Sequence, residues 1–366
     1  MTAGNDAGNG VSTLLDQAGD VRTGEELDIQ RIDTFLKTHI EGLIGLPTVQ
    51  QFPGGASNLT YLLQYPQRSL ILRRPPFGHR AKSAHDMLRE ARIMSAVKPV
   101  YPYVPTVLAT CEDRAVMDCD FYVMEQIRGI IPRQNLPTGL NLSESQTRQL
   151  CINVIDRMIE LHQVDYRKAG LEGLGRGGGY VVRQIEGWSD RYRKAKTPDV
   201  GDFEQVMAFL KDKMPQQDVA TCLIHNDFRF DNVVLNPDNP FEVIGVLDWE
   251  MATLGDPLMD LGNTLAYWVQ ADDDDDYQSV RRQPTNAPGM MSRQEVIEYY
   301  GSKTGWQVDN FDFYLIYGLF RLAVIVQQIY FRYFNGDTKN KAFANFGFIS
   351  RMLEKRCLRL IDASRL

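Results

Sequence analysis

Residues 225–260 constrain this chain more than any other stretch, and they read HNDFRFDNVVLNPDNPFEVIGVLDWEMATLGDPLMD. Two short apolar runs, Val233–Leu235 and Val243–Leu247, flank the segment Asn236–Pro240. That segment is built from Asn, Pro and Asp, which are typical of turns. The pattern therefore predicts a β-hairpin. Because a hairpin brings its two ends together, polar side chains just outside both runs should converge.

Those polar side chains are Asp227 and Asn232 before the first run and Asp248 directly after the second. Two carboxylates and an amide oxygen suit a hard cation such as Mg²⁺, which prefers oxygen ligands. A carboxylate that is not bound to the metal could orient and deprotonate an attacking hydroxyl in phosphoryl transfer. The alternative is a surface hairpin whose Asp and Asn side chains only cap turns. The joint spacing favours the site.

The spacing also carries a family resemblance. His-x-Asp-x-x-x-x-Asn, an apolar strand pair and then Leu-Asp-Trp-Glu resemble the catalytic and metal-binding motifs of the aminoglycoside phosphotransferase and choline kinase family. Gly255–Leu261 matches another segment common in that family. The resemblance implies an α+β, protein-kinase-like fold with two lobes. The N-lobe would hold a five-stranded antiparallel sheet plus a helix, and the C-lobe would be mainly α-helical with a catalytic hairpin.

The whole chain is compatible with two lobes, since 366 residues can bury two cores. We expect a flexible N-terminal tail over 1–24, a nucleotide-binding N-lobe over 25–124, a hinge over 125–131 and a catalytic and substrate-binding C-lobe over 132–366. The net charge of −7 argues against nucleic acid as a partner. No uninterrupted apolar run has the ~18–20 residues that span a bilayer, so no membrane partner is expected.

The N-terminal residues and the cysteines bear on where the protein is located. Residues 1–24 lack the basic start and apolar core of a signal peptide. The five cysteines are odd in number and scattered without metal-ligand spacing. A cytoplasmic protein, monomeric or homodimeric, is the simplest expectation.

The first lobe should begin with a helix within 26–43 and continue as strands. The expected strands are Gln50–Phe52, Leu59–Tyr65, Ser69–Arg73, Val104–Ala109 and Phe121–Met124. Between the first two lie Gly54, Gly55, Ser57 and Asn58, where backbone N–H groups and short side chains can approach phosphates. A plain glycine hairpin is the alternative. The resemblance favours a nucleotide-covering loop.

Two further nucleotide contacts follow from the resemblance. Kinases place a lysine on the third strand to hold phosphates and to pair with a helix glutamate, and this chain has Arg73 there. Glu90, on the helix expected over 86–97, is the predicted partner, although a lone glutamate on a helix is usually solvated. Met124, Glu125 and Ile127 end the last strand, where backbone groups would hold the adenine if this strand end is the hinge.

The second lobe should be mainly helical from Ser143, where Ser143 and Gln146 have capping-box spacing. His162, at the end of that helix, is interpreted as structural. The five aspartates at 272–276 are interpreted as a solvated turn, with cation binding as the alternative.

The apolar segment Phe311–Phe334 is the best indicator of the acceptor, because a helix would bring Arg321, Gln328 and Arg332 near one face. These residues either pair with core carboxylates or, where one faces the cleft, favour an anionic acceptor. Together with the block around Trp188, this segment resembles a branch that includes the kinase-like domains attached to some acyl-CoA dehydrogenases. That branch is associated with hydroxyacyl substrates.

The resemblance therefore implies transfer of the γ-phosphoryl group of ATP, or of GTP, to the hydroxyl of a small molecule. Asp227 would accept the proton, Asn232 and Asp248 would hold Mg²⁺, and Arg229 would offset charge on the transferring group. His225 would support the catalytic loop. A hydroxy acid or hydroxyacyl-CoA is the expected acceptor.

Three alternatives stay open at this point. An aminoglycoside kinase would need an acidic acceptor pocket. A choline-like small-alcohol kinase would need an aromatic cage, for which Trp188, Trp249 and Trp268 are the candidates. A nucleotide-binding regulator without catalysis, a pseudokinase, belongs to another class of protein.

Overall fold

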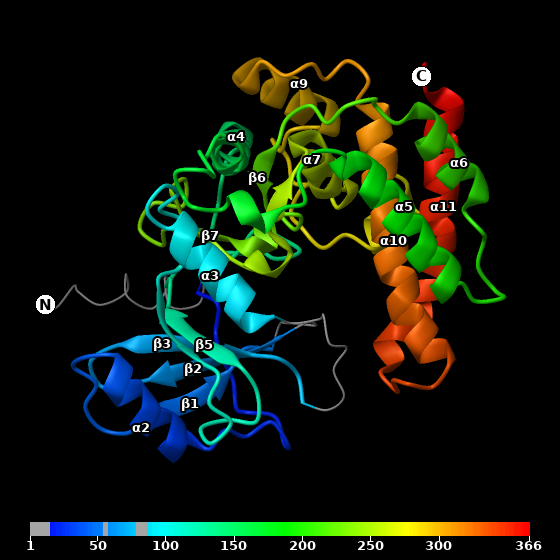
Figure 1. Cartoon of the computed structure of the whole chain (residues 1–366). Helices are drawn as coiled ribbons and strands as arrows, with labels where there is room; N and C mark the ends of the chain where they lie inside the picture. The colour runs from blue at the N-terminus through cyan, green and yellow to red at the C-terminus, as the bar shows by residue number, and fades with distance from the viewer. Residues whose placement is uncertain (1–14, 54–57, 78–85) are drawn as a thin grey trace, which may run out of the picture. The chain divides into compact units, whose positions relative to one another are not determined.

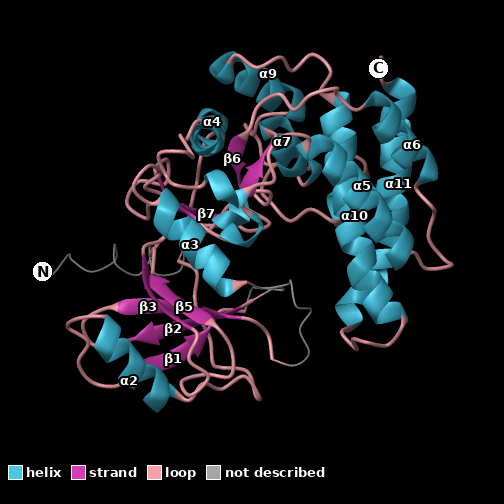
Figure 2. Cartoon of the chain, in the orientation of Figure 1, coloured by secondary structure: helices cyan, strands magenta, loops and turns pink. Residues whose placement is uncertain are grey.

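The computed structural model describes residues 15–53, 58–77 and 86–366. The chain divides into two compact units (Figures 1 and 2). The first unit comprises residues 1–131, 166–171 and 232–252, and the second comprises 132–165, 172–231 and 253–366. The hairpin that follows the catalytic loop thus belongs to the first unit, while the loop itself belongs to the second.

The first unit contains a five-stranded antiparallel sheet in the order β1-β2-β3-β5-β4. The strands are β1 (Thr48–Gln51), β2 (Leu59–Gln64), β3 (Ser69–Arg74), β4 (Val107–Cys111) and β5 (Phe121–Glu125). All five lie where the sequence predicts strands, to within a few residues at their ends. The predicted sheet is confirmed.

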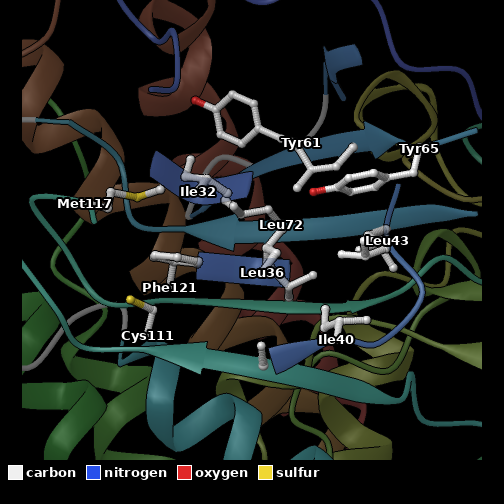
Figure 3. Close-up of a cluster of buried hydrophobic side chains, with 14 of the residues drawn as sticks. Ile32, Leu36, Ile40, Leu43, Tyr61, Tyr65, Leu72, Cys111, Met117 and Phe121 are labelled. Carbon is white, nitrogen blue, oxygen red and sulfur yellow. The ribbon is translucent and has the colours of Figure 1, made fainter. Parts of the chain in front are cut away.

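Helix α2 (Ile29–His39) covers one face of this sheet. Its Ile32 and Leu36 pack with Tyr61, Leu72 and Phe121 in a buried cluster (Figure 3). Side chains alternate across a strand. The residue after Leu72 therefore points to the opposite face, toward helix α3 (Met87–Val97).

Part of the predicted tail packs against the sheet. Gly19 forms a pair of backbone hydrogen bonds with Gln51 at the end of β1, and the Gln51 side chain also contacts Arg22 and Glu25. The expectation of a flexible tail over 1–24 is therefore wrong for this part, because Gln51 presents both a backbone edge and a buried amide that the incoming segment satisfies. Residues 1–14 lie outside the described residues.

The predicted catalytic hairpin is present. Strands β7 (Val233–Leu235) and β8 (Val243–Val246) pair antiparallel, and the 3₁₀ turn η3 (Trp249–Met251) follows them. Ile130 forms a two-way backbone bridge with Leu235, so the end of the predicted hinge lies against β7. Gly129 permits this approach, because a Cβ there would lie 2.4 Å from the Leu235 carbonyl oxygen.

The second unit is mainly helical. Its long helices are α4 (Glu144–His162), α5 (Tyr180–Ala195), α6 (Glu204–Lys213), α7 (Pro257–Ala266), α9 (Arg293–Thr304), α10 (Asp312–Phe334) and α11 (Phe346–Ala363). Shorter elements are η1 (Glu172–Leu174), η2 (Phe230–Asn232), α8 (Asp275–Ser279), η4 (Lys341–Asn345) and the strand pair β6 (Cys222–Ile224) with β9 (Thr253–Gly255). The predicted capping box at Ser143 and Gln146 is confirmed.

Helix α10 is the centre of this unit and packs against α5, α6, α7 and α11. Backbones of α7 and α10 cross in direct contact, since a Cβ on Gly318 would lie 2.1 Å from the carbonyl oxygen of Gly262. By length and composition α10 could cross a membrane, and 67% of its apolar window is buried inside the structure. A core helix passes the same test.

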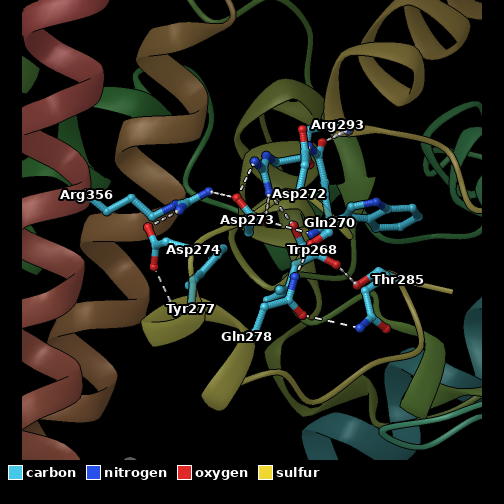
Figure 4. Close-up of polar contacts among 12 residues, drawn as sticks. Trp268, Gln270, Asp272, Asp273, Asp274, Tyr277, Gln278, Thr285, Arg293 and Arg356 are labelled. Atoms are coloured by element: carbon cyan, nitrogen blue, oxygen red, sulfur yellow. Dashed lines mark hydrogen bonds and ion pairs between the residues drawn. The ribbon is translucent and has the colours of Figure 1, made fainter.

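The aspartate run at 272–276 differs from the predicted solvated turn. The side chain of Asp273 is only 6% exposed and pairs with Arg293 at 2.7 Å and with Arg356 of α11 (Figure 4). Burial raises the pKa of Asp273, but the hydrogen bonds from both guanidinium groups hold it below its ordinary value. The interpretation as a solvated turn is wrong for Asp273, because arginines distant in sequence supply the counter-charge.

Candidate active site

The catalytic loop 225–231 is held through its backbone by groups of the second unit. Asp260 of α7 accepts hydrogen bonds from the amides of His225 and Asn226 at 2.8 and 2.7 Å. Further along, the Phe228 carbonyl accepts from the Thr264 hydroxyl, and the Phe230 amide donates to the Gln283 side chain at 2.8 Å. Four backbone groups in six residues are thereby satisfied by buried side chains. The loop is rigidly positioned by α7 and the segment after α8.

The buried carboxylate of Asp260 is itself held by His162. The Nε2 atom of His162 lies 3.0 Å from Asp260, and its Nδ1 atom lies 2.6 Å from the Tyr300 hydroxyl. Although burial raises the pKa of Asp260, His162 and the backbone amides hold that pKa below its ordinary value. His162 is therefore structural, as its place at a helix end predicts.

Asp227, the predicted base, forms an ion pair within its own loop. Arg229 Nε lies 3.2 Å from Asp227 and 3.4 Å from Asp231, and the guanidinium lies over the Tyr267 ring at 4.7 Å. The Asp227 amide donates to His225 Nδ1 at 3.3 Å, so His225 contacts the loop that it was predicted to support. Arg229 thus stands beside the predicted base, where it can offset negative charge.

In the first unit, the hairpin places Asn232 and Asp248 at the same end. The Leu247 amide donates to the Asn232 carbonyl at 2.8 Å, immediately before Asp248. Asp248 has a left-handed backbone, with φ of 68°. Non-glycine residues adopt this conformation rarely, and such strain gathers at functional sites.

The pair Arg73 and Glu90 forms as predicted, with Nη1 and Oε1 3.1 Å apart. The second Nη of Arg73 also donates to Asp248 at 2.9 Å. Burial lowers the pKa of Arg73, but the charges of Glu90 and Asp248 hold it well above its ordinary value. Burial also raises the pKa of Glu90, and the nearby Asp248 raises it further against the lowering by Arg73. Two carboxylates share one guanidinium, which leaves an excess of negative charge.

This charge balance fits a magnesium ion. Asp248 and Asn232 offer a carboxylate and an amide oxygen from one hairpin end, and Mg²⁺ commonly takes one or two protein ligands with substrate phosphates and water. Within the described part of the chain, no group of three or more His, Cys, Asp or Glu residues could hold a metal. The donor set thus suits a cation that arrives with phosphate oxygens rather than one held in a protein cage.

The segment after Asp248 is tied to the sheet. The buried Asn58 donates to Glu250 at 2.7 Å, and Arg89 of α3 donates to the carbonyls of Glu250 and Ala252. Asn58 is the described end of the predicted phosphate loop. The other predicted members, Gly54, Gly55 and Ser57, lie outside the described residues.

The predicted adenine-binding strand end is well defined. Met124 is buried in β5, and Glu125 forms an exposed ion pair with Arg68. Ile127 packs on Gly245 of β8, where a Cβ would lie 2.8 Å from its Cδ1 atom. These residues remain predictions as nucleotide contacts, since any hydrogen bond to an adenine would come from their backbone.

The predicted acceptor residues have different surroundings. Arg321 is only 4% exposed, donates to the Asn226 carbonyl at 3.0 Å and lies 5.3 Å from the Trp188 ring. Gln328 and Arg332 are exposed, because they lie in the last two turns of α10, after the buried Gln327. Of the three residues, Arg321 is the one that contacts the catalytic loop, through the Asn226 carbonyl.

Each of the three tryptophans proposed for an aromatic cage has a hydrogen-bond partner within its own unit. Trp249 lies in the first unit, and its indole N–H donates to Val246. Trp268 is buried and donates to Met291, whereas Trp188 donates to Gln184 and has Arg191 over its ring at 4.6 Å as well as Arg321. A cationic ligand at Trp188 would meet two guanidinium groups.

Comparison with known proteins places this geometry in a family. A model of the phosphotransferase enzyme family matches residues 48–295, which include the sheet, the catalytic loop and the hairpin. The chain belongs to this family. Membership supports a phosphotransferase function. It does not identify the group that accepts the phosphoryl.

Two curated relatives of this phosphotransferase show where such chains occur. Acyl-CoA dehydrogenase family member 10 of Mus musculus is 33% identical over 325 residues, which cover 87% of this chain and 30% of that protein. Acyl-CoA dehydrogenase family member 11 of Homo sapiens is 30% identical over 343 residues, covering 92% and 43%. The chain thus spans less than half the length of these relatives.

Solved structures support the kinase-like fold. A presumed aminoglycoside phosphotransferase of Ralstonia eutropha JMP134 is 28% identical with a TM-score of 0.79, covering 93% of this chain and all of that one. Choline kinase of Cryptosporidium parvum Iowa II has a TM-score of 0.62 at 13% identity, covering 92% of this chain and 97% of the kinase. The second likeness shows the fold alone.

Several residues around the phosphotransferase loop escape sequence reasoning. Tyr180, Thr264 and Gln283 each form a hydrogen bond with the loop from a distant segment, and Asn226, within the loop, is the residue that accepts from Tyr180. Glu250 had a signal, because it lies two positions after Asp248 in the Leu-Asp-Trp-Glu motif. The others have no local pattern that would distinguish them.

Proposed function

We propose that this family member is a small-molecule kinase that transfers the γ-phosphoryl group of ATP, with GTP as the alternative donor, to an alcohol hydroxyl. The observation that carries the proposal is the ion-pair chain from Glu90 through Arg73 to Asp248. It is the arrangement that protein kinases need between their phosphate-binding cation, helix glutamate and metal-binding aspartate.

Each predicted residue then has a role in the transfer. Asp248 and Asn232 would hold Mg²⁺, which would neutralise charge on the phosphates when bound. Arg73 contacts the phosphates, and the loop that ends at Asn58 covers them. Asp227 accepts the proton of the acceptor hydroxyl, while Arg229 offsets the charge that develops beside it.

For the acceptor, we propose a hydroxy acid or a hydroxyacyl-CoA. Among the residues described, no carboxylate forms an ion pair with the buried Arg321, so this second-unit cation keeps its charge uncompensated by an acid. Arg191 adds a second cation at Trp188. These charges favour an anionic acceptor over choline or a polycationic aminoglycoside. The names of the relatives, which are acyl-CoA dehydrogenases, favour an acyl-CoA derivative.

The test uses purified protein with MgATP or MgGTP and a panel of hydroxy acids, hydroxyacyl-CoAs, choline and aminoglycosides. Nucleoside diphosphate release and phosphorylated product are measured together. D227N is compared with D231N, because both carboxylates lie near Arg229 Nε but only Asp227 is the proposed base. We expect D227N to lower kcat by about 10²–10⁴-fold, as the loss of a general base does, and D231N to retain activity.

The outcomes separate the candidate functions. Turnover with choline or aminoglycosides alone would replace the proposed acceptor class. Nucleotide binding without turnover on any acceptor, with D227N indistinguishable from wild type, would make the protein a regulator instead of a kinase.

A further inference from the structure

The residue before the proposed base has an unusual backbone. Asn226 has φ of 64°, and only two other described non-glycine residues, Phe203 and Asp248, have positive φ. Asparagine tolerates the left-handed region better than most side chains because its short amide can hydrogen-bond locally. Since the backbone direction at 226 sets where the next Cα–Cβ bond points, this conformation determines the direction of the Asp227 carboxylate.

Three polar groups of Asn226 are held by helices of the second unit: its backbone amide, its carbonyl and its side-chain oxygen. Its amide donates to Asp260, and its carbonyl accepts from Arg321 Nη2 at 3.0 Å. Its side-chain oxygen accepts from the Tyr180 hydroxyl at 3.2 Å and from Asn263 Nδ2 at 3.1 Å. These partners come from α5, α7 and α10.

Arg321 is the informative member of this set. It lies in the middle of an apolar helix and is 4% exposed, where a cation is costly without strong partners. In the described part of the chain it has no carboxylate partner, and the hydrogen bond that it donates goes to the Asn226 carbonyl. If Arg321 served only to fill space in the core, an apolar side chain of similar volume would do so with a smaller desolvation cost.

We propose that Arg321 and Asn226 are positioning residues: Arg321 holds the left-handed peptide of Asn226, and this peptide aims the Asp227 carboxylate at the acceptor hydroxyl. The inference rests on the proposed role of Asp227 as the base. It extends that proposal, because the helices α5 and α10 that carry the proposed acceptor contacts also set the direction of the base. A ligand that moves either helix would then change the alignment of Asp227.

The first test compares R321M with R191M. Arg191 lies over the same Trp188 ring and is one of the cations proposed for the acceptor, so R191M should raise the KM of the acceptor, whereas it leaves the Asn226 carbonyl bond and therefore kcat in place. We expect R321M to lower kcat on the order of 10- to 100-fold, since a misplacement of about 1 Å can cost this much. The KM for MgATP should not change, and R321K, which keeps one donor, should recover part of the kcat. Equal kcat values for R321M and R191M, or an effect confined to KM, would overturn the proposal.

A second pair of variants tests the backbone directly. N226G keeps access to the left-handed region and loses the side-chain acceptor, whereas N226A loses both. We expect N226A to have the lower kcat of the two. If N226A equals wild type, the backbone conformation does not position the base. This pair also decides the matter should R321M fail to fold.

Amide hydrogen exchange distinguishes failure of this inference from failure of the proposed function. Exchange in peptides covering 225–231 is measured for wild type, R321M and R191M without any acceptor. Faster exchange in R321M alone supports the holding role even if D227N shows that Asp227 is not the base. Unchanged exchange in R321M contradicts the holding role whatever the activity.

Discussion

The carboxylate of Asp260 provides the sharpest stability test in this structure. It is completely buried and accepts hydrogen bonds from His162 Nε2 at 3.0 Å and from the His225 and Asn226 amides at 2.8 and 2.7 Å. D260N keeps the shape but replaces one acceptor oxygen by an NH₂ group, so a buried donor loses its partner and the other donors lose a charged acceptor. Removing a charged acceptor from several buried donors in this way costs about 3–5 kcal/mol of unfolding free energy. For a unit of this size, that corresponds to a fall in Tm of roughly 6–20 °C.

The pH dependence of this effect has a definite sign. The pKa of Asp260 is lowered in the folded state, while an unfolded aspartate titrates near ~3.9. Its stabilising contribution is therefore complete above that value and is lost as the pH falls through the folded pKa. The difference in unfolding free energy between wild type and D260N should narrow on acidification. Denaturant unfolding followed by circular dichroism at neutral and acidic pH measures it.

Asp256, at the start of the same helix, is the matched control with the opposite sign. Burial raises its pKa to about 6, although three backbone amides lower it. Between these pH values the folded state holds a proton that the unfolded state releases. The unfolding free energy of wild type should therefore fall by about 3 kcal/mol relative to that of D256N as the pH rises from about 4 to 6. The reasoning would be refuted if D260N and D256N shifted in the same direction with pH, or if D260N cost less than about 1 kcal/mol at neutral pH.

Two further substitutions test the nucleotide site and the helix crossing. E90Q removes the buried charge beside Arg73 while keeping the shape of the side chain, so kcat/KM for MgATP should fall by roughly tenfold or more. E125Q removes a charge from an exposed ion pair and should have no effect in the same assay. G318A would place a Cβ 2.1 Å from the Gly262 carbonyl oxygen of α7, and the unfolding free energy measured with denaturant should fall by about 3 kcal/mol or more. G173A is the control, because a Cβ on Gly173 would meet open space. Equal unfolding free energies for the two variants would contradict the close helix crossing.

Local pattern was sufficient where the chain folds on itself over short distances. The hairpin β7–β8 follows from two apolar runs and a turn, and the Ser143–Gln146 capping box follows from spacing. The pair Arg73–Glu90 was expected from family resemblance, and its geometry is present. The catalytic and metal roles of these residues stay predictions.

Local pattern fails where the partner is distant in sequence. Nothing near Asp273 indicates that Arg293 and Arg356 will surround it, so a run of aspartates reads as solvated. For Arg321 the choice between an internal partner and the acceptor was open, and the partner proved to be a backbone carbonyl 95 residues earlier. Every residue carries a backbone carbonyl, so a partner of this kind leaves no residue-type pattern in the sequence from which it could be predicted.

The direct backbone contact between α7 and α10 at Gly262 and Gly318 has a consequence for how acceptor preference can change among related chains. Asp260 and Arg321 lie within one turn of that contact, on the two helices that hold the catalytic loop. No side chain lies between the two backbones at this contact, so there is no room there for a larger residue on either helix. The last two turns of α10, where Gln328 and Arg332 are exposed, lie beyond this contact. Evolution can therefore vary the distal surface of α10 without disturbing the machinery that orients Asp227.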